Sequence, residues 1–143
     1  MVIKVKVLSR YCSSPPTQIL SGSDRLIQCG PLYPDILDIL DSCVIAVVTD
    51  KCFGDMQLHN ITADEIKVFI RSAVSSGRYI NSVWCSVNPK GKGIAACDSY
   101  EVDGYTKDKN GNQIPSKIYL KFCISKTGQT IMQVSMHPST FNN

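Results

Sequence analysis

Hydrophobic and polar residues alternate along the C-terminal segment from Lys117 to His137, on both sides of a turn that contains Gly128. A period of two is typical of a β-strand with one buried face, so the segment predicts a two-faced β-hairpin. The apolar face carries Ile118, Leu120, Phe122, Ile124, Met132, Val134 and Met136. The polar face carries Lys117, Tyr119, Lys121, Gln133, Ser135 and His137.

The turn sets the register of this hairpin. A three-residue loop over 126–128, with Gly128 in the left-handed conformation, keeps the two apolar faces matched. In this register Lys121 faces Gln133, Tyr119 faces Ser135 and Lys117 faces His137.

Two helices are predicted upstream. Residues 62–76 begin with the capping box Thr62-Ala-Asp-Glu65, carry apolar residues at helical spacing and end at Gly77. A shorter helix over 35–42 follows Pro34 and has acidic residues in its first turn, as helix N-termini prefer.

The remaining apolar runs predict strands. Residues 2–8 form one, and residues 43–49 form another that is buried on both faces. Residues 79–87 and 94–105 precede the hairpin. The chain is therefore predicted to be α+β, with an antiparallel meander sheet of about four strands packed on one or two helices. This unit spans 61–139, and residues 1–60 form an N-terminal strand-helix-strand extension.

Composition places the chain among globular proteins. Its 143 residues fit a single domain, and 43% hydrophobic with 19% charged residues excludes intrinsic disorder. The sequence shows neither a membrane-spanning run nor an export signal, which favours a cytoplasmic location without membrane association. A net charge of +3 permits an anionic partner but is too weak for nonspecific coating of DNA.

Seven cysteines form no Cys-x-x-Cys pair and leave an odd one over. This pattern indicates neither a disulfide framework nor a zinc site, and reduced structural thiols are expected. A cysteine-dependent enzyme would need a thiol beside a histidine, and Cys123 beside Lys121 is the candidate for that reading. No metal or other cofactor is predicted.

Several polar residues have side chains suited to phosphate chemistry. A histidine at position 137 can move protons near neutral pH, and Arg78, which follows the end of the helix, can hold a phosphate in a fork. Lys90 and Lys92, in Lys90-Gly-Lys-Gly93, offer two more cations. The structural alternatives are a solvated sheet face, a surface cation near the helix end and a plain basic turn.

Three segments of the C-terminal half resemble small ribonuclease toxins of the MqsR and RelE type. They are 102–105 (Val-Asp-Gly-Tyr), 117–124 (Lys-Ile-Tyr-Leu-Lys-Phe-Cys-Ile) and 131–137 (Ile-Met-Gln-Val-Ser-Met-His). The resemblance lies within residues 62–139 and implies that Lys121 occupies the position of the catalytic lysine and Tyr105 that of the active-site tyrosine. The Ser-Met-His ending and the long N-terminal extension depart from the family pattern.

The resulting hypothesis is a metal-independent endoribonuclease that acts as a growth-inhibiting toxin, with RNA bound on the polar face of the hairpin. RNA carries an internal nucleophile, so cleavage needs only proton transfer and charge stabilisation. The expected catalytic residues are Lys121, His137, Tyr105 and Arg78. The expected substrate-binding residues are Tyr119, Ser135, Gln133, Lys117, Lys90 and Lys92.

A toxin of this kind implies a protein partner that silences it, and a small acidic inhibitor or antitoxin is expected. The alternative function is a noncatalytic binding protein, such as a phage- or plasmid-borne inhibitor or immunity factor, that uses the same sheet face. Turnover on RNA separates the two, because a binding protein would protect RNA without cleaving it.

Overall fold

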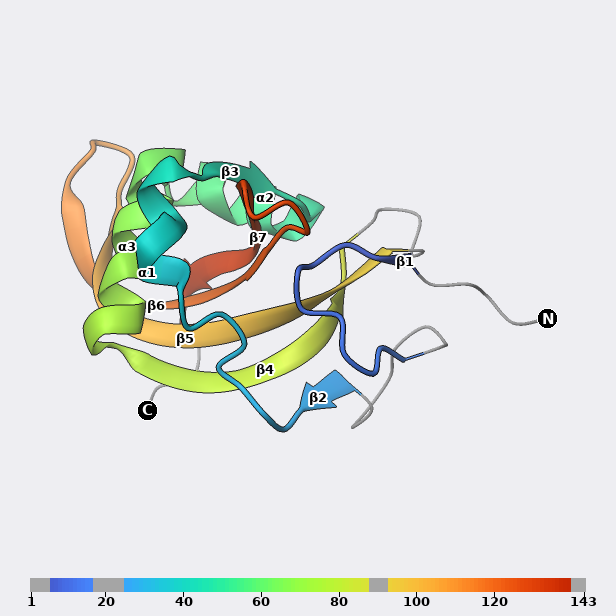
Figure 1. Cartoon of the computed structure of the whole chain (residues 1–143). Coiled ribbons are helices and arrows are strands. Elements are labelled where there is room, and N and C mark those ends of the chain that lie inside the picture. Colours follow the sequence, from blue (N-terminus) through green and yellow to red (C-terminus); the bar gives the residue numbers. More distant parts are fainter. Residues whose placement is uncertain (1–5, 17–24, 88–92, 140–143) are drawn as a thin grey trace.

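A computed structural model describes residues 6–16, 25–87 and 93–139 of the chain. It confirms the predicted α+β class, because helices pack on a mostly antiparallel mixed sheet whose centre is a β4-β5-β6-β7 meander (Figure 1). The strands are β1 (Lys6–Val7), β2 (Leu26–Ile27), β3 (Val44–Val47), β4 (Arg78–Ser86), β5 (Gly93–Lys107), β6 (Gln113–Ile124) and β7 (Thr130–Pro138). The helices are α1 (Ile36–Ile39), the 3₁₀ turn η2 (Leu40–Ser42), α2 (Asp50–Leu58) and α3 (Ala63–Ser76).

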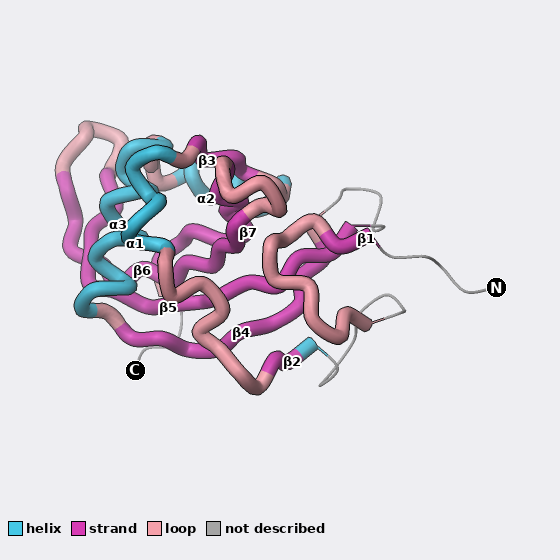
Figure 2. The backbone as a smooth tube through the Cα atoms, viewed as in Figure 1, coloured by secondary structure: helices cyan, strands magenta, loops and turns pink. Residues whose placement is uncertain are grey.

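The sheet has the strand order β2-β4-β5-β6-β7-β3, and β1 pairs in parallel with the start of β5. The long strands β4 and β5 curve together beneath the helices (Figure 2). Helix α3 packs on β4 and β5, and α2 lies against β7. The predicted N-terminal extension therefore contributes strands to both ends of the one sheet.

Helix α3 follows its sequence signals closely. The Thr62 hydroxyl accepts a hydrogen bond from the Glu65 N–H at 3.2 Å, and the Glu65 carboxylate accepts one from the Thr62 N–H at 3.0 Å, so the predicted capping box is confirmed. The helix ends where predicted, but Gly77 has a φ of −86° and is not left-handed. Glycine fits there because a Cβ would lie 2.7 Å from the carbonyl oxygens of Ala73 and Glu101.

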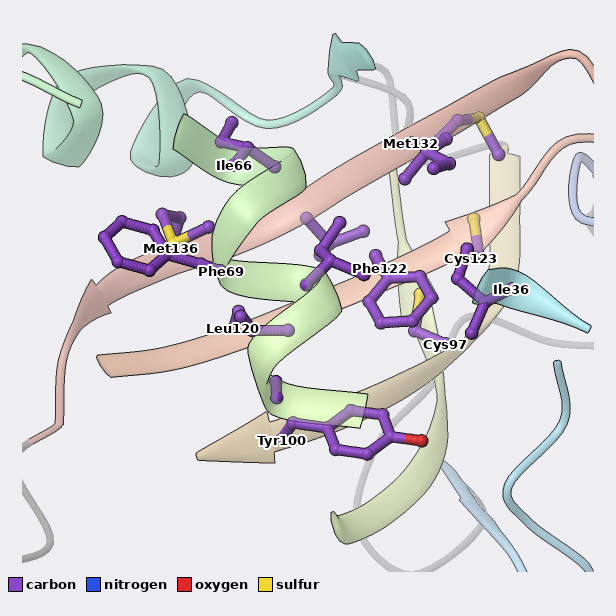
Figure 3. Packing of buried hydrophobic residues seen from close by; sticks show 14 of the residues in the cluster. Ile36, Ile66, Phe69, Cys97, Tyr100, Leu120, Phe122, Cys123, Met132 and Met136 are labelled. Carbon is purple, nitrogen blue, oxygen red and sulfur yellow. The ribbon is translucent and has the colours of Figure 1, made fainter. Parts of the chain in front are cut away.

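The core lies between α3 and the sheet (Figure 3). Ile66, Phe69 and Ile70 are buried on the inner face of the helix, as the apolar stripe predicts. The Phe69 ring meets the Tyr105 ring edge-on, with 5.2 Å between their centroids. On the sheet side, Tyr100 and Phe122 stack at 6.1 Å. Leu120 and Phe122, with Met136 opposite Leu120, lie on this side of the hairpin. Met132, by contrast, lies opposite Cys123, and Val134 lines a hollow beside Lys121, so these two differ from the predicted apolar face.

Two elements differ from expectation. The strand predicted as buried on both faces is β3, an edge strand that pairs only with β7, and its Val44 is 67% exposed. Helix α2 was not predicted, because Asp, Lys, Gly and Gln interrupt any apolar stripe over 50–58. Its start is set locally, since the Thr49 side chain accepts a hydrogen bond from the Cys52 N–H at 3.1 Å.

All seven cysteines are free thiols, and five of them are buried: Cys43, Cys52, Cys85, Cys97 and Cys123. Burial raises the pKa of the Cys52 thiol to about 12 and that of Cys97 well above its ordinary value. These thiols therefore pack as small hydrophobic side chains and are poor nucleophiles.

Candidate functional site

The sheet face turned away from α3 carries two rows of polar side chains, which we call the polar face. Residues directly opposite each other in an antiparallel ladder share a face of the sheet. The first row is Arg78, Glu101, Tyr119 and His137, and the second is Asn81, Ser99, Lys121 and Ser135. The predicted gathering of Lys121, Tyr119, Ser135 and His137 on one face is therefore observed.

The predicted pairing within these rows was wrong by two residues, for two separate reasons. The loop spans four residues, 126–129, because Ser125 donates its N–H to the Thr130 carbonyl at 2.9 Å and Ile124 pairs with Ile131. The ladder then shifts by one more residue after Phe122, where β7 bulges. As a result, Lys121 faces Ser135 and Tyr119 faces His137. The left-handed Gly128 is confirmed, with φ +76°.

The same shift removes Gln133 from the polar face. Gln133 lies opposite Phe122 and is fully buried, and its side-chain amide donates to the Ser135 carbonyl at 2.9 Å. A side chain in this position cannot reach a substrate on the polar face, so the predicted binding role of Gln133 is not supported.

His137 stacks on Tyr119, with 5.2 Å between ring centroids and 28° between ring planes. Its Nδ1 lies 2.8 Å from the Pro138 carbonyl oxygen. A carbonyl only accepts, so Nδ1 carries the hydrogen, and in the neutral ring the lone pair lies on Nε2. The ring is thus held in the tautomer that a general base requires.

Lys121 also lies against this aromatic residue, with Nζ 5.9 Å from the Tyr119 ring centroid. Among the described residues, no carboxylate pairs with this ammonium group. Burial lowers the pKa of Lys121, but electrostatic interactions with Cys85, Tyr119 and Cys97 outweigh it, and the net pKa is raised. Lys121 is therefore a cation at neutral pH, suited to stabilising negative charge.

Two hollows of about 310 Å³ each open beside Lys121. One is lined by Arg25, Leu26, Asn81, Val83, Tyr119 and Lys121. The other is lined by Arg25, Thr49, Lys51, Cys85, Ser86, Lys121, Val134 and Ser135. Neither lining contains an Asp or a Glu, so both hollows favour an anionic ligand. Sequence reasoning missed Arg25, because nothing in its local pattern indicates that β2 brings it beside the hairpin.

Arg78 and Lys117 also lie toward this face, but their charges are paired. Arg78 forms an ion pair with Glu101 at 2.9 Å, and Lys117 lies 3.2 Å from a carboxylate oxygen of Asp103. Hydrogen bonds from Ser139 and Arg78 hold the pKa of Glu101 below its ordinary value, so the carboxylate stays charged. Arg78 is therefore less available to a phosphate than Lys121.

Tyr105 lies near the C-terminal end of β5, against α3. Its hydroxyl donates to the Glu65 carboxylate at 2.6 Å, and Lys107 pairs with the other oxygen of that carboxylate at 2.7 Å. The hydrogen bond to Glu65 raises the pKa of Tyr105. The structure therefore does not bring Tyr105 together with Lys121 and His137. Lys90 and Lys92 lie outside the described residues.

No family model, curated protein or solved structure matches the chain. The resemblance to MqsR- and RelE-type toxins therefore stays a prediction. In the described ranges, no cluster of His, Cys, Asp and Glu side chains could hold a metal ion, and no helix has the length and apolar character needed to span a membrane.

Proposed function

We propose that the polar face binds single-stranded RNA and that the protein cleaves it without a metal ion, as a growth-inhibiting endoribonuclease. The observation that carries this proposal is the arrangement around Tyr119. Lys121, whose ammonium group has no carboxylate partner among the described residues, and His137, whose neutral ring carries its lone pair on Nε2, both lie against the Tyr119 ring. These are the cation and the base that cleavage by an internal nucleophile requires.

In the proposed reaction, His137 Nε2 takes the proton of a ribose 2′-hydroxyl. The 2′ oxygen attacks the adjacent phosphorus and the bond to the 5′ oxygen breaks, which gives a 2′,3′-cyclic phosphate and a 5′-hydroxyl end. Lys121 stabilises the extra negative charge on the phosphorus oxygens in the transition state. A water molecule protonates the leaving 5′ oxygen, and His137 later returns its proton to solvent.

The proposed catalytic set is smaller than the four residues that the sequence suggests. His137 and Lys121 act on the reacting atoms. Ser135, which lies opposite Lys121, can form a hydrogen bond to the RNA through its hydroxyl. Arg78 contributes positive potential at the edge of the face while it remains paired with Glu101. Tyr105 has no part in the reaction, because its hydroxyl is held by Glu65.

A noncatalytic binding protein is the second candidate. The contact of Tyr105 with Glu65 and the ion pair of Arg78 with Glu101 favour it. Neither side chain is then available to assist His137 and Lys121 in catalysis. Both candidates use the same surface, and turnover on RNA separates them.

We further propose that a small acidic protein inhibits this one by covering the polar face. Its carboxylates would pair with Lys121 and Arg25, whose charges no described carboxylate compensates. Pairing of this kind speeds association and weakens with added salt. Lys121→Glu should therefore lower the affinity for the inhibitor, whereas a partner that is insensitive to this change would bind elsewhere.

The proposed function is tested by incubating the purified protein with labelled RNA in the presence of a chelator. Cleavage by the parent protein, reduced ~10²-fold in Lys121→Ala, supports the assignment. Lys126→Ala is the matched control, because Lys126 is exposed in the turn of the same hairpin. RNA that is bound but stays intact would identify the protein as a noncatalytic binder.

A further inference from the structure

The two hollows on the polar face adjoin each other and share Arg25 and Lys121. We propose that these two side chains hold one phosphate of the RNA strand between them, with the strand continuing into the hollow on each side. The proposal, which rests on the proposed function for its ligand class, assigns a binding site to Arg25, a residue of the N-terminal extension.

Two contacts with β4 fix the position of the Arg25 side chain. Its Nε donates to the Trp84 carbonyl at 3.1 Å, and its Nη2 lies 3.8 Å from the Cys85 sulfur. Trp84 and Cys85 are buried residues of β4, so the guanidinium is anchored to the rigid centre of the sheet. An arginine presents five N–H donors in a plane, and those not used by this anchor remain for a phosphate.

The charge balance of the site favours an anion. Three cations line the hollows, and one of them, Lys51, is paired with Asp55 at 2.8 Å. Neither Arg25 nor Lys121 has a carboxylate partner in the described part of the chain. Two uncompensated positive charges thus border the same space. A phosphate placed there neutralises charge that the fold leaves exposed.

Both hollows combine apolar walls with a few polar groups, so either can take part of a nucleotide. The hollow at β2 has apolar walls from Leu26 and Val83 and one amide, Asn81, whose Oδ1 accepts a hydrogen bond from Ser99 at 2.5 Å. The Nδ2 of Asn81 is therefore the atom left to donate to a base. This combination of apolar surface with a few placed polar groups is typical of small-ligand sites.

The hollow at α2 has apolar walls from Cys85 and Val134 as well as polar groups. Hydroxyls of Thr49, Ser86 and Ser135 line it together with Lys51. Ser86, Ser135 and Lys51 can donate to phosphate oxygens, whereas the Thr49 hydroxyl already donates to the Val134 carbonyl at 2.8 Å. At about 310 Å³ this hollow is near the lower limit of ~300 Å³ for ligand pockets, which suits a phosphate with part of its sugar.

The test measures binding of a 2′-O-methyl oligoribonucleotide, which cannot be cleaved through the 2′ oxygen. We expect Arg25→Gln to weaken binding at least ~10-fold and to reduce the salt dependence by about one phosphate contact. Arg71→Gln is the matched control, since Arg71 is an exposed arginine on α3 that pairs with Asp41 outside the polar face. The control should change binding less than ~2-fold.

Arg25→Lys serves as a second variant in case Arg25→Gln perturbs folding, which thermal unfolding would reveal. This variant keeps the positive charge but loses the planar set of guanidinium N–H donors. It should therefore bind the oligoribonucleotide with an affinity between those of the parent and Arg25→Gln. Arg25 variants that bind as tightly as Arg71→Gln would overturn the proposed phosphate site even if the protein cleaves RNA. Conversely, a parent protein that binds through Arg25 but never cleaves unmodified RNA would refute the nuclease and leave this site standing.

Discussion

The imidazole of His137 on β7 stacks on the phenol ring of Tyr119 on β6, with 5.2 Å between their centroids. Lys121 Nζ lies 5.9 Å from the centroid of the same ring. The Tyr119 ring thus lies against both the base and the cation that we assign to the reaction. Because all three residues come from two paired strands, the spacing is held by the backbone ladder of the sheet.

The role of His137 as a base predicts chemical rescue. His137→Ala should reduce RNA cleavage ~10²-fold, because the 2′-hydroxyl loses its proton acceptor. Added imidazole should restore part of the activity, since a small base can enter the space left by the ring. The measurement is the cleavage rate against imidazole concentration. An unrescued loss, accompanied by weaker binding of uncleavable RNA, would mean that His137 serves binding or structure instead.

Tyr105→Phe should leave cleavage unchanged and lower stability. The variant loses the hydrogen bond from Tyr105 to Glu65, which should cost about 1 kcal/mol of unfolding free energy. Denaturant unfolding and the RNA assay measure the two effects on the same preparation. Full stability together with a large loss of cleavage would restore the catalytic role that the sequence suggested for Tyr105.

Glu65 should make the fold sensitive to acid. Burial raises its pKa, but hydrogen bonds from Lys107, Tyr105 and Thr62 dominate and lower it from 4.5 to about 2. A carboxyl whose pKa is lower in the folded state stabilises the fold above its unfolded pKa, and this stability is lost as the pH falls through the folded value. The stabilisation at neutral pH is on the order of 2–3 kcal/mol.

Glu65→Gln should therefore unfold more easily at neutral pH and lose stability less steeply between pH 4.5 and about 2 than the parent protein does. Denaturant unfolding across that range measures the difference. Asp64→Asn, at the exposed neighbouring position, is the control. Equal acid sensitivity in Glu65→Gln and the parent would show that Glu65 does not link the fold to pH.

Phe69→Ala should destabilise the fold by ~3–5 kcal/mol through lost burial and the cavity that remains. Phe69 is 3% exposed and packs between α3 and β5, where its ring contacts Tyr105. Val68, its neighbour on the helix, is 55% exposed, so Val68→Ala should cost less than about 1 kcal/mol. Similar unfolding midpoints for the two variants would contradict the assignment of Phe69 to the core.

The sequence predicted best those elements whose signals are local. The capping box and apolar stripe of α3 and the two faces of β6 appear as expected, because period and capping depend on a few adjacent residues. The two-residue error in hairpin register arose from the loop length and the bulge in β7, which alternation alone does not reveal. Helix α2 was not predicted because it depends on packing against β7 and has no apolar period of its own.

The candidate site was predictable only in part. Lys121, Tyr119, Ser135 and His137 share a face because they share a hairpin. Arg25 and Asn81 join them through the β2-β4 and β4-β5 pairings. Such contacts depend on strand order, which one sequence does not specify. Tyr105 was misplaced for the same reason, because the packing of α3 against β5 brings its ring to Phe69 and its hydroxyl to Glu65.

The ends of the RNA fragments test the central claim most directly. Cleavage by the internal 2′-hydroxyl leaves a 2′,3′-cyclic phosphate and a 5′-hydroxyl, and a substrate with a single 2′-deoxy residue should resist cleavage at that position. We predict both results for the purified protein in the presence of a chelator. Fragments with 3′-hydroxyl and 5′-phosphate ends, or RNA that stays intact with an active fold, would contradict the proposed reaction.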